Sequence, residues 1–190
     1  MIFSMKPALR LAFVAIVSGA FLAPLGSAQA GGSKPTGGEI RIGGAYHGYA
    51  SAESGTVDVS VDALLPAFDL GKPLSGDAFS LHPQIGVDLN TQGKTNAAFA
   101  GFAAVVRLPA NFKIEADLGG SVNDGNKTSD NGSGRSELGC NALFREAFGI
   151  GYQITPDVSL MAFAEHMSNA NLCSPNNGIT NFGLKFGYAF

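Results

Sequence analysis

The chain has 190 residues, a formal net charge of −3 at neutral pH and no tryptophan. A net negative charge without a cluster of Lys and Arg argues against a nucleic-acid-binding protein, which typically has a basic surface patch. The sequence contains 26 glycines, and beyond its N-terminus no apolar run reaches the ~18 residues that a membrane-spanning helix needs.

The first thirty residues have the pattern of a secretory signal. Lys6 and Arg10 precede an apolar stretch over 11–25, and Ala28-Gln29-Ala30 fits a small-residue cleavage site. An anchoring helix is the alternative, but the stretch is shorter than the ~20 residues of a bilayer span. We therefore expect residues 1–30 to be a cleaved signal peptide of an exported protein.

Residues 31–190 are expected to form one domain built of β-strands. Valines at 57, 59 and 61 alternate with the polar residues at 58, 60 and 62, which is the period of two that a strand requires. Such segments, ten or so residues long, are typical of outer-membrane barrels. The fold expected is all-β, an eight-stranded antiparallel transmembrane β-barrel of the bacterial outer membrane. Its strands are expected near 39–50, 55–65, 79–90, 95–107, 112–121, 142–154, 157–168 and 178–190.

The connections differ in length, which orients the barrel. The segments 122–139 and 169–177 are long and polar, whereas those at 109–111 and 155–156 are short. Long loops of such barrels face outside and short turns face the periplasm. Cys140 and Cys173 then lie at the same outer rim, and two cysteines in an exported chain favour a disulfide. No ligand spacing suggests a metal site, and none is expected.

The final strand carries an apolar stripe that ends on an aromatic residue, formed by Phe182, Leu184, Phe186, Tyr188 and Phe190. This stripe resembles the C-terminal strand that the outer-membrane assembly machinery recognises. We therefore expect that machinery to be a partner during export, whereas an ordinary amphipathic last strand is the alternative.

Two polar residues stand on an apolar strand face. His166 and Ser168 are two positions apart and share the face of Val158, Leu160 and Ala162. If that face meets lipid, polar side chains there are costly without a function. A hydroxyl beside an imidazole is the minimum for nucleophilic acyl transfer. The alternative is a polar pair at the membrane rim.

The longer string His166-Met167-Ser168-Asn169-Ala170, followed by Asn176, Gly178 and an aromatic closing strand, resembles the lipid A 3-O-deacylase family. Phe144-Arg145-Glu146 and Gly151-Tyr152 are also similar to that family. The resemblance is best over about 143–190, and the first half matches only as a generic barrel.

The resemblance implies an outer-membrane serine esterase that removes an ester-linked acyl chain from lipid A, with lipopolysaccharide of the outer leaflet as its partner and no cofactor. Carried over residue by residue, Ser168 matches the nucleophile and His166 the general base. Asn169 and Asn176 match asparagines of the motif as oxyanion contributors, with Asn176 favoured.

The sequence departs from the family pattern at two positions. Thr180 stands where the family has the acidic residue that orients the histidine, and Asn171 stands where a glycine is usual. Glu146 offers a compensation, because pairing of the neighbouring strands with their faces matched puts His166 beside either Phe144 or Glu146. We treat Glu146 as a hypothetical orienting acid; the alternative is that it is solvated at the rim or paired with Arg145 or Lys185.

Two rival functions stay open. The loss of the acid at Thr180 favours a non-catalytic barrel of the same ancestry. An opacity-type adhesin or small porin-like barrel would instead bind partners with its long loops and line its lumen with charges, namely Lys113, Glu115, Asp117 and Lys185.

Overall fold

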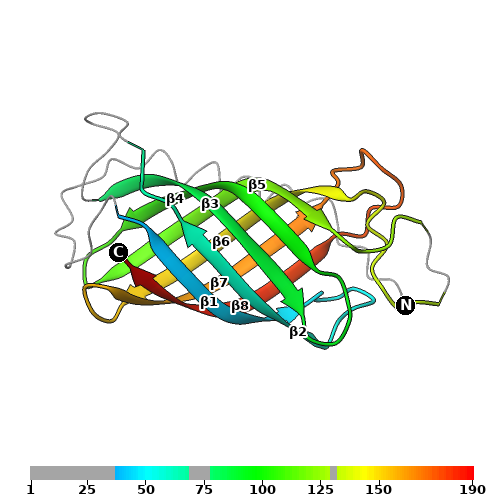
Figure 1. Cartoon of the computed structure of the whole chain (residues 1–190), viewed down its shortest axis with the longest axis horizontal. Coiled ribbons are helices and arrows are strands. Elements are labelled where there is room, and N and C mark those ends of the chain that lie inside the picture. Colours follow the sequence, from blue (N-terminus) through cyan, green and yellow to red (C-terminus); the bar gives the residue numbers. More distant parts are fainter. Residues whose placement is uncertain (1–36, 69–77, 129–131) are drawn as a thin grey trace.

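The computed structural model describes residues 37–68, 78–128 and 132–190. These residues form a closed antiparallel barrel in which each strand pairs with the next and β1 pairs with β8 (Figure 1). The strands are β1 (Glu39–His47), β2 (Thr56–Leu64), β3 (Phe79–Asn90), β4 (Ala97–Arg107), β5 (Phe112–Asn123), β6 (Ala142–Gln153), β7 (Val158–Ser168) and β8 (Ile179–Ala189). The expected eight-stranded β-barrel is confirmed. The expected signal peptide, residues 1–30, lies outside the described residues.

Strand bounds differ from the sequence-based expectation by a few residues at the loops. The first strand ends at His47 rather than near 50, because Gly48 has a positive φ of 64° and turns the chain. The fifth strand runs to Asn123, two residues further than expected, since pairing with β6 continues to Val122 and Ala142. Turn geometry and pairing partners, rather than alternation, set these ends. Within the described residues, no helix is long and apolar enough to cross a membrane.

The two ends of the barrel are unlike. One end carries both the first described residues and the C-terminus, with the turns 108–111 and 154–157. The other carries the loops 48–55, 91–96, 124–141 and 169–178, and we call it the loop end. Figure 1 shows the C-terminus at the left and the loop that follows β7 at the right.

The outer surface is apolar, and the lumen is polar. Large apolar side chains that are more than a third exposed lie along every strand except β7, for example Ile42, Leu118 and Leu184. Inward positions carry charges that are almost fully buried. An eight-stranded barrel is just wide enough for its side chains to fill the interior, and here ion pairs do much of the filling.

Most of the lumenal charges form ion pairs, which offset the cost of their burial in a low dielectric. Arg41 contacts both Asp62 and Glu115, and Lys185 reaches Asp62 at 2.8 Å. Further along the lumen, Arg145 binds Glu165 at 2.9 Å. Apolar clusters lie at both ends of the lumen and, around Met161 and Phe163, beside the charged layer. The cluster at the loop end consists of Ala97, Leu138, Leu143, Met167 and Ile179.

Candidate active site on the outer face of β6, β7 and β8

Three polar side chains form one row across neighbouring strands. Glu146 on β6 pairs with His166 on β7, which pairs with Thr180 on β8. All three are half-buried and alternate with buried neighbours such as Met167. Because successive residues of a strand point to opposite faces, the row lies on the outer surface. The outward direction of His166 and Ser168 thus agrees with the sequence-based expectation.

His166 is held by Thr180. The imidazole Nδ1 lies 2.8 Å from Thr180 Oγ1, within hydrogen-bond distance. The tautomer in which Nδ1–H donates to this hydroxyl leaves a lone pair on Nε2. Thr180 therefore stands in contact with His166 at the position where the sequence pattern expected an acid.

The edge of the imidazole formed by Cε1 and Nε2 lies over Gly178. A Cβ added at Gly178 would come within 2.9 Å of His166 Cε1 and 3.2 Å of His166 Nε2, so only glycine leaves this space for the ring. Gly178 also has a positive φ of 64°, which glycine adopts without strain. The β7–β8 register, continued by one residue, brings Ser168 opposite Gly178. Nε2 is thus turned toward the part of the site where Ser168 lies.

Glu146 lies beside His166 but does not replace Thr180. Of the two partners expected for His166, Phe144 and Glu146, the register selects Glu146, and directly opposed side chains in a sheet interact. The hydrogen bond at Nδ1, however, goes to Thr180. An orienting role of Glu146 therefore stays a prediction. The Glu146 carboxylate would act on the His166 imidazole through its charge, from the neighbouring strand.

Apolar and aromatic side chains surround the polar row. Phe144 pairs with Ser168 across β6 and β7 and is 55% exposed. On the other side, Tyr49 and Phe182 form an edge-to-face pair with ring centroids 5.5 Å apart. The hydroxyl and the imidazole therefore stand in a surface suited to hydrocarbon chains rather than to a water-soluble substrate.

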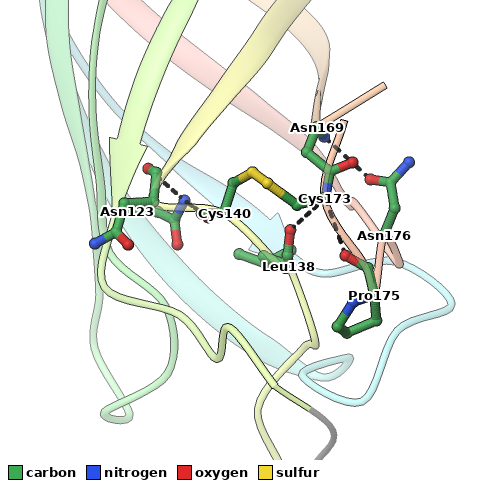
Figure 2. Close-up of a disulfide and its surroundings, with 8 residues drawn as sticks. Asn123, Leu138, Cys140, Asn169, Cys173, Pro175 and Asn176 are labelled. Carbon is green, nitrogen blue, oxygen red and sulfur yellow. Dashed lines mark hydrogen bonds between the residues drawn. A yellow bond between two sulfur atoms is a disulfide. The ribbon is translucent and has the colours of Figure 1, made fainter. Parts of the chain in front are cut away.

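The structure differs from expectation at Asn169. This side chain is 1% exposed, and its Nδ2 donates to Leu138 O at 2.7 Å and Pro175 O at 2.9 Å. Figure 2 shows these two bonds beside the disulfide. Both amide hydrogens are occupied on the inner side of the strand, so Asn169 ties two loops together instead of pointing at an outward oxyanion.

Asn176 bridges Asn169 and Asn171 in the loop that follows β7. Its Oδ1 accepts the Asn169 backbone N–H at 3.0 Å, and its Nδ2 donates to Asn171 Oδ1 at 3.0 Å. Asn171 has a positive φ of 66°, a conformation that asparagine tolerates better than most residues other than glycine. Asn171 thus adopts the left-handed backbone that a glycine would adopt at the same position.

A disulfide joins the two loops next to the site. Cys140 and Cys173 are bonded, with their Cα atoms 5.8 Å apart, and Figure 2 places the bond beside Asn169 and Asn176. Asn177 N also donates to Glu137 O at 3.1 Å. This bond attaches the segment before β6 to the loop that follows Ser168.

The lumen offers no comparable site within the residues that the structure describes. The charges that the sequence analysis assigned to the lumen do face inward: Lys113, Glu115, Asp117 and Lys185. They are engaged with other lumenal groups, as in the bond from Lys113 to Glu39 at 2.8 Å. In the same described residues, no group of three or more His, Cys, Asp or Glu side chains is arranged to hold a metal ion.

Sequence analysis missed one polar cluster at the loop end. Glu53 bonds to Thr95 and Ser136, which are 42 and 83 residues away in the chain. Partners so distant have no characteristic spacing, so no sequence pattern could have revealed the cluster.

The sequence profile of the family described as lipid A 3-O-deacylase (PagL) matches residues 54–189. No curated protein sequence matches the chain.

Solved structures share the fold at low sequence identity. The crystal structure of the outer membrane enzyme PagL is 19% identical with a TM-score of 0.59, covering 80% of this chain and 99% of that one. The N-terminal β-barrel domain of Pseudomonas aeruginosa OprF is 11% identical with a TM-score of 0.57, covering 82% and 98%. A de novo designed transmembrane β-barrel is 14% identical with a TM-score of 0.53, covering 83% and 98%.

Proposed function

Because the chain belongs to the lipid A 3-O-deacylase (PagL) family and is a β-barrel of the bacterial outer membrane, we propose that it is a serine esterase that removes an ester-linked acyl chain from lipid A. The observation that carries the proposal is the outward row at the loop end. His166 is oriented by Thr180, and its Nε2 edge is directed over Gly178 toward the neighbourhood of Ser168.

The location of the row selects the substrate class. The side chains lie outside the barrel among Phe144 and Phe182, near the end of β7. A lipid of the outer leaflet can bring an ester to this level while its acyl chains stay in the hydrocarbon. A water-soluble ester would have to cross into an apolar surface, which costs free energy.

The proposed reaction uses only groups of this chain and one water. His166 Nε2 takes the proton of Ser168 Oγ as that oxygen attacks the ester carbonyl carbon. The oxyanion accepts hydrogen bonds from the remaining Nδ2 hydrogen of Asn176 and from the backbone N–H of Asn171. Collapse breaks the ester C–O bond, and the leaving sugar hydroxyl takes the proton from His166. Water, deprotonated by the same nitrogen, then attacks the acyl carbon. The bond from that carbon to Ser168 Oγ breaks, the fatty acid leaves, and Oγ takes the proton back from His166.

Thr180 supplies orientation without charge. Its hydroxyl accepts Nδ1–H and so keeps the lone pair on Nε2, but it offers the imidazolium no anion during attack. Glu146 on the neighbouring strand is the acid closest in register to His166, and we propose that its carboxylate contributes that charge. The expected enzyme is therefore slower than one with an acid hydrogen-bonded to Nδ1.

A non-catalytic barrel of the same family is the second candidate, and Thr180 is the observation that favours it. Loss of the orienting acid in a serine hydrolase lowers turnover by up to about 10⁴-fold. The porin-like rival is disfavoured, since the lumenal charges are buried and most of them are paired with one another.

The proposal is tested by expressing the protein in the outer membrane of a host and analysing the lipid A of that membrane by mass spectrometry. We expect loss of one ester-linked acyl chain with the wild type and none with Ser168→Ala. Ser121→Ala, a buried serine on β5, is the matched control and should act as the wild type does. Unchanged lipid A with folded wild type would favour the non-catalytic candidate, and activity in Ser168→Ala would exclude Ser168 as nucleophile.

The same expression experiment tests two expectations on export. N-terminal sequencing of the membrane-inserted protein should begin after Ala30 if residues 1–30 are a cleaved signal. Removal of Phe190 should slow insertion if the assembly machinery reads the terminal strand.

A further inference from the structure

Glu53 joins three loops at the loop end. Its carboxylate is 0% exposed although it lies in the loop 48–55. It accepts hydrogen bonds from Thr95 N and Oγ1 at 2.7 Å each and from Ser136 N at 2.6 Å. His47 Nε2 lies 2.8 Å from Glu53 Oε2 and is a fourth hydrogen-bond partner of the carboxylate. One side chain of the first loop therefore fixes the second and third loops.

The third loop supports the candidate site from behind. Two residues after Ser136, Leu138 is fully buried and packs with Met167 and Ile179. These are the inward neighbours of the outward residues on β7 and β8, lying between His166 and Ser168 and between Gly178 and Thr180. Leu138 O also accepts Asn169 Nδ2 at 2.7 Å. The position of this loop thus fixes the strand ends that carry the outward row.

The first loop is attached to the same strands. Tyr49 N donates to Thr180 O at 2.7 Å, and Gly48 N donates to Asn181 Oδ1 at 2.9 Å. Glu53 lies four residues after Tyr49. Its bonds therefore connect the backbone of Thr180 on one side with the loop behind Met167 on the other.

We propose that Glu53 is a positioning residue of the esterase, holding the loop ends of β7 and β8 so that His166 and Ser168 keep their reactive geometry. The proposal rests on the function proposed above. Strand ends next to long loops are among the least stable parts of a fold, and a displacement of ~1 Å at a reacting group can lower a rate by about 10²-fold.

The chemistry of the cluster calls for a carboxylate. Two oxygens with four acceptor sites serve Thr95, Ser136 and His47 at once. Burial alone would raise the pKa of the Glu53 carboxyl, but the hydrogen bonds from His47, Thr95 and Ser136 outweigh it and lower this pKa to about 2. The anion is present throughout the neutral range. In Glu53→Gln, one carboxylate oxygen is replaced by an NH₂ group. That group donates hydrogen bonds and would face donors of Thr95, Ser136 or His47 instead of accepting from them.

The test compares Glu53→Gln and Thr95→Val with Asp157→Asn as the charge-matched control. Asp157 is exposed in the turn at the opposite end of the barrel. Each variant is refolded into detergent, and folding is checked by the mobility difference between unheated and heated samples on a gel. Thr95→Val removes one hydroxyl donor, and it keeps the test decisive if Glu53→Gln does not fold.

Two independent readouts are taken. The first is kcat and KM on a lipid-embedded ester. We expect kcat to fall about tenfold or more in Glu53→Gln and about threefold in Thr95→Val, with KM unchanged within about twofold. The second needs no activity: hydrogen exchange of the Tyr49 and Asn169 amides, which bond to Thr180 O and Asn176 Oδ1. We expect exchange to rise about tenfold in Glu53→Gln and to stay unchanged in the control.

The outcomes separate the two proposals. An inactive wild type would refute the esterase, while unchanged exchange in the folded variants would refute positioning by Glu53 whatever the activity. If the wild type is active, a normal kcat in folded Glu53→Gln would also overturn the positioning role of Glu53. A change confined to KM would do the same. A lower kcat together with faster exchange would establish it.

Discussion

At Thr180 a neutral hydroxyl holds the imidazole of His166 where a carboxylate would add charge. We expect Thr180→Val, which keeps the shape and removes the hydroxyl, to lower kcat about tenfold, the worth of one hydrogen bond of ~1 kcal/mol or slightly more. Thr180→Ser should stay within about twofold. Thr180→Glu should raise kcat about tenfold or more, because charge-assisted hydrogen bonds are roughly twice as strong. Deacylation kinetics on purified protein decide this, and a Val variant as active as the Ser variant would exclude orientation by Thr180.

Gly178 allows a second prediction at the same scale. Gly178→Ala places a Cβ 2.9 Å from His166 Cε1 on a backbone with φ of 64°. The ring has to move, so we expect kcat to fall at least about tenfold, in proportion to the lost geometry. Gly93→Ala is the matched control, since Gly93 also has a positive φ of 73° but no heavy atom near its Cβ position. If both substitutions lowered kcat equally, the loss would be due to backbone strain and not to displacement of the imidazole.

Among the elements, the loop 48–55 depends on the charge of Glu53. The pKa of this carboxyl is lowered from 4.5 to about 2, so its contribution to stability is present above pH 4.5 and is lost as the pH falls from there through 2. At ~1.4 kcal/mol per pKa unit, it amounts to about 3 kcal/mol at most. The titratable group facing it is His47, whose Nδ1 contacts Asp58 at 2.6 Å. Thr95 and Ser136, which face it from the other loops, do not titrate.

This pH dependence is measured on the loop amides. In an NMR titration of the refolded barrel, we expect the amide shifts of Thr95 and Ser136 to move with a midpoint near pH 2. The same amides of Glu53→Gln should not titrate in that range. A midpoint near 4.5 in the wild type would contradict the cluster as described.

The whole molecule is a barrel closed to ions rather than a pore. Arg41, Arg145 and Lys185 cross the lumen and pair with buried carboxylates. Breaking such pairs leaves uncompensated buried charges, which costs several kcal/mol each. We therefore expect no stepwise conductance when the protein is inserted into a planar lipid bilayer. Steady single-channel currents would contradict a filled lumen and reopen the porin-like alternative.

The sequence by itself determined the barrel, its strands and the outward face of His166 and Ser168. These follow from local rules, because the alternation of side chains fixes strand faces and the lengths of connections fix the orientation. The register across a short turn is nearly as local, which is why the sequence narrowed the partner of His166 on the preceding strand to Phe144 or Glu146.

Only the tertiary structure decided which contacts these residues make. Three contacts depend on side chains that barrel closure brings together. Thr180 forms a hydrogen bond with His166, Asn169 donates inward to loop carbonyls, and Glu53 accepts hydrogen bonds from two other loops. No periodicity encodes such contacts, because their partners lie tens of residues apart and their geometry is set by how the loops pack over the end of the lumen.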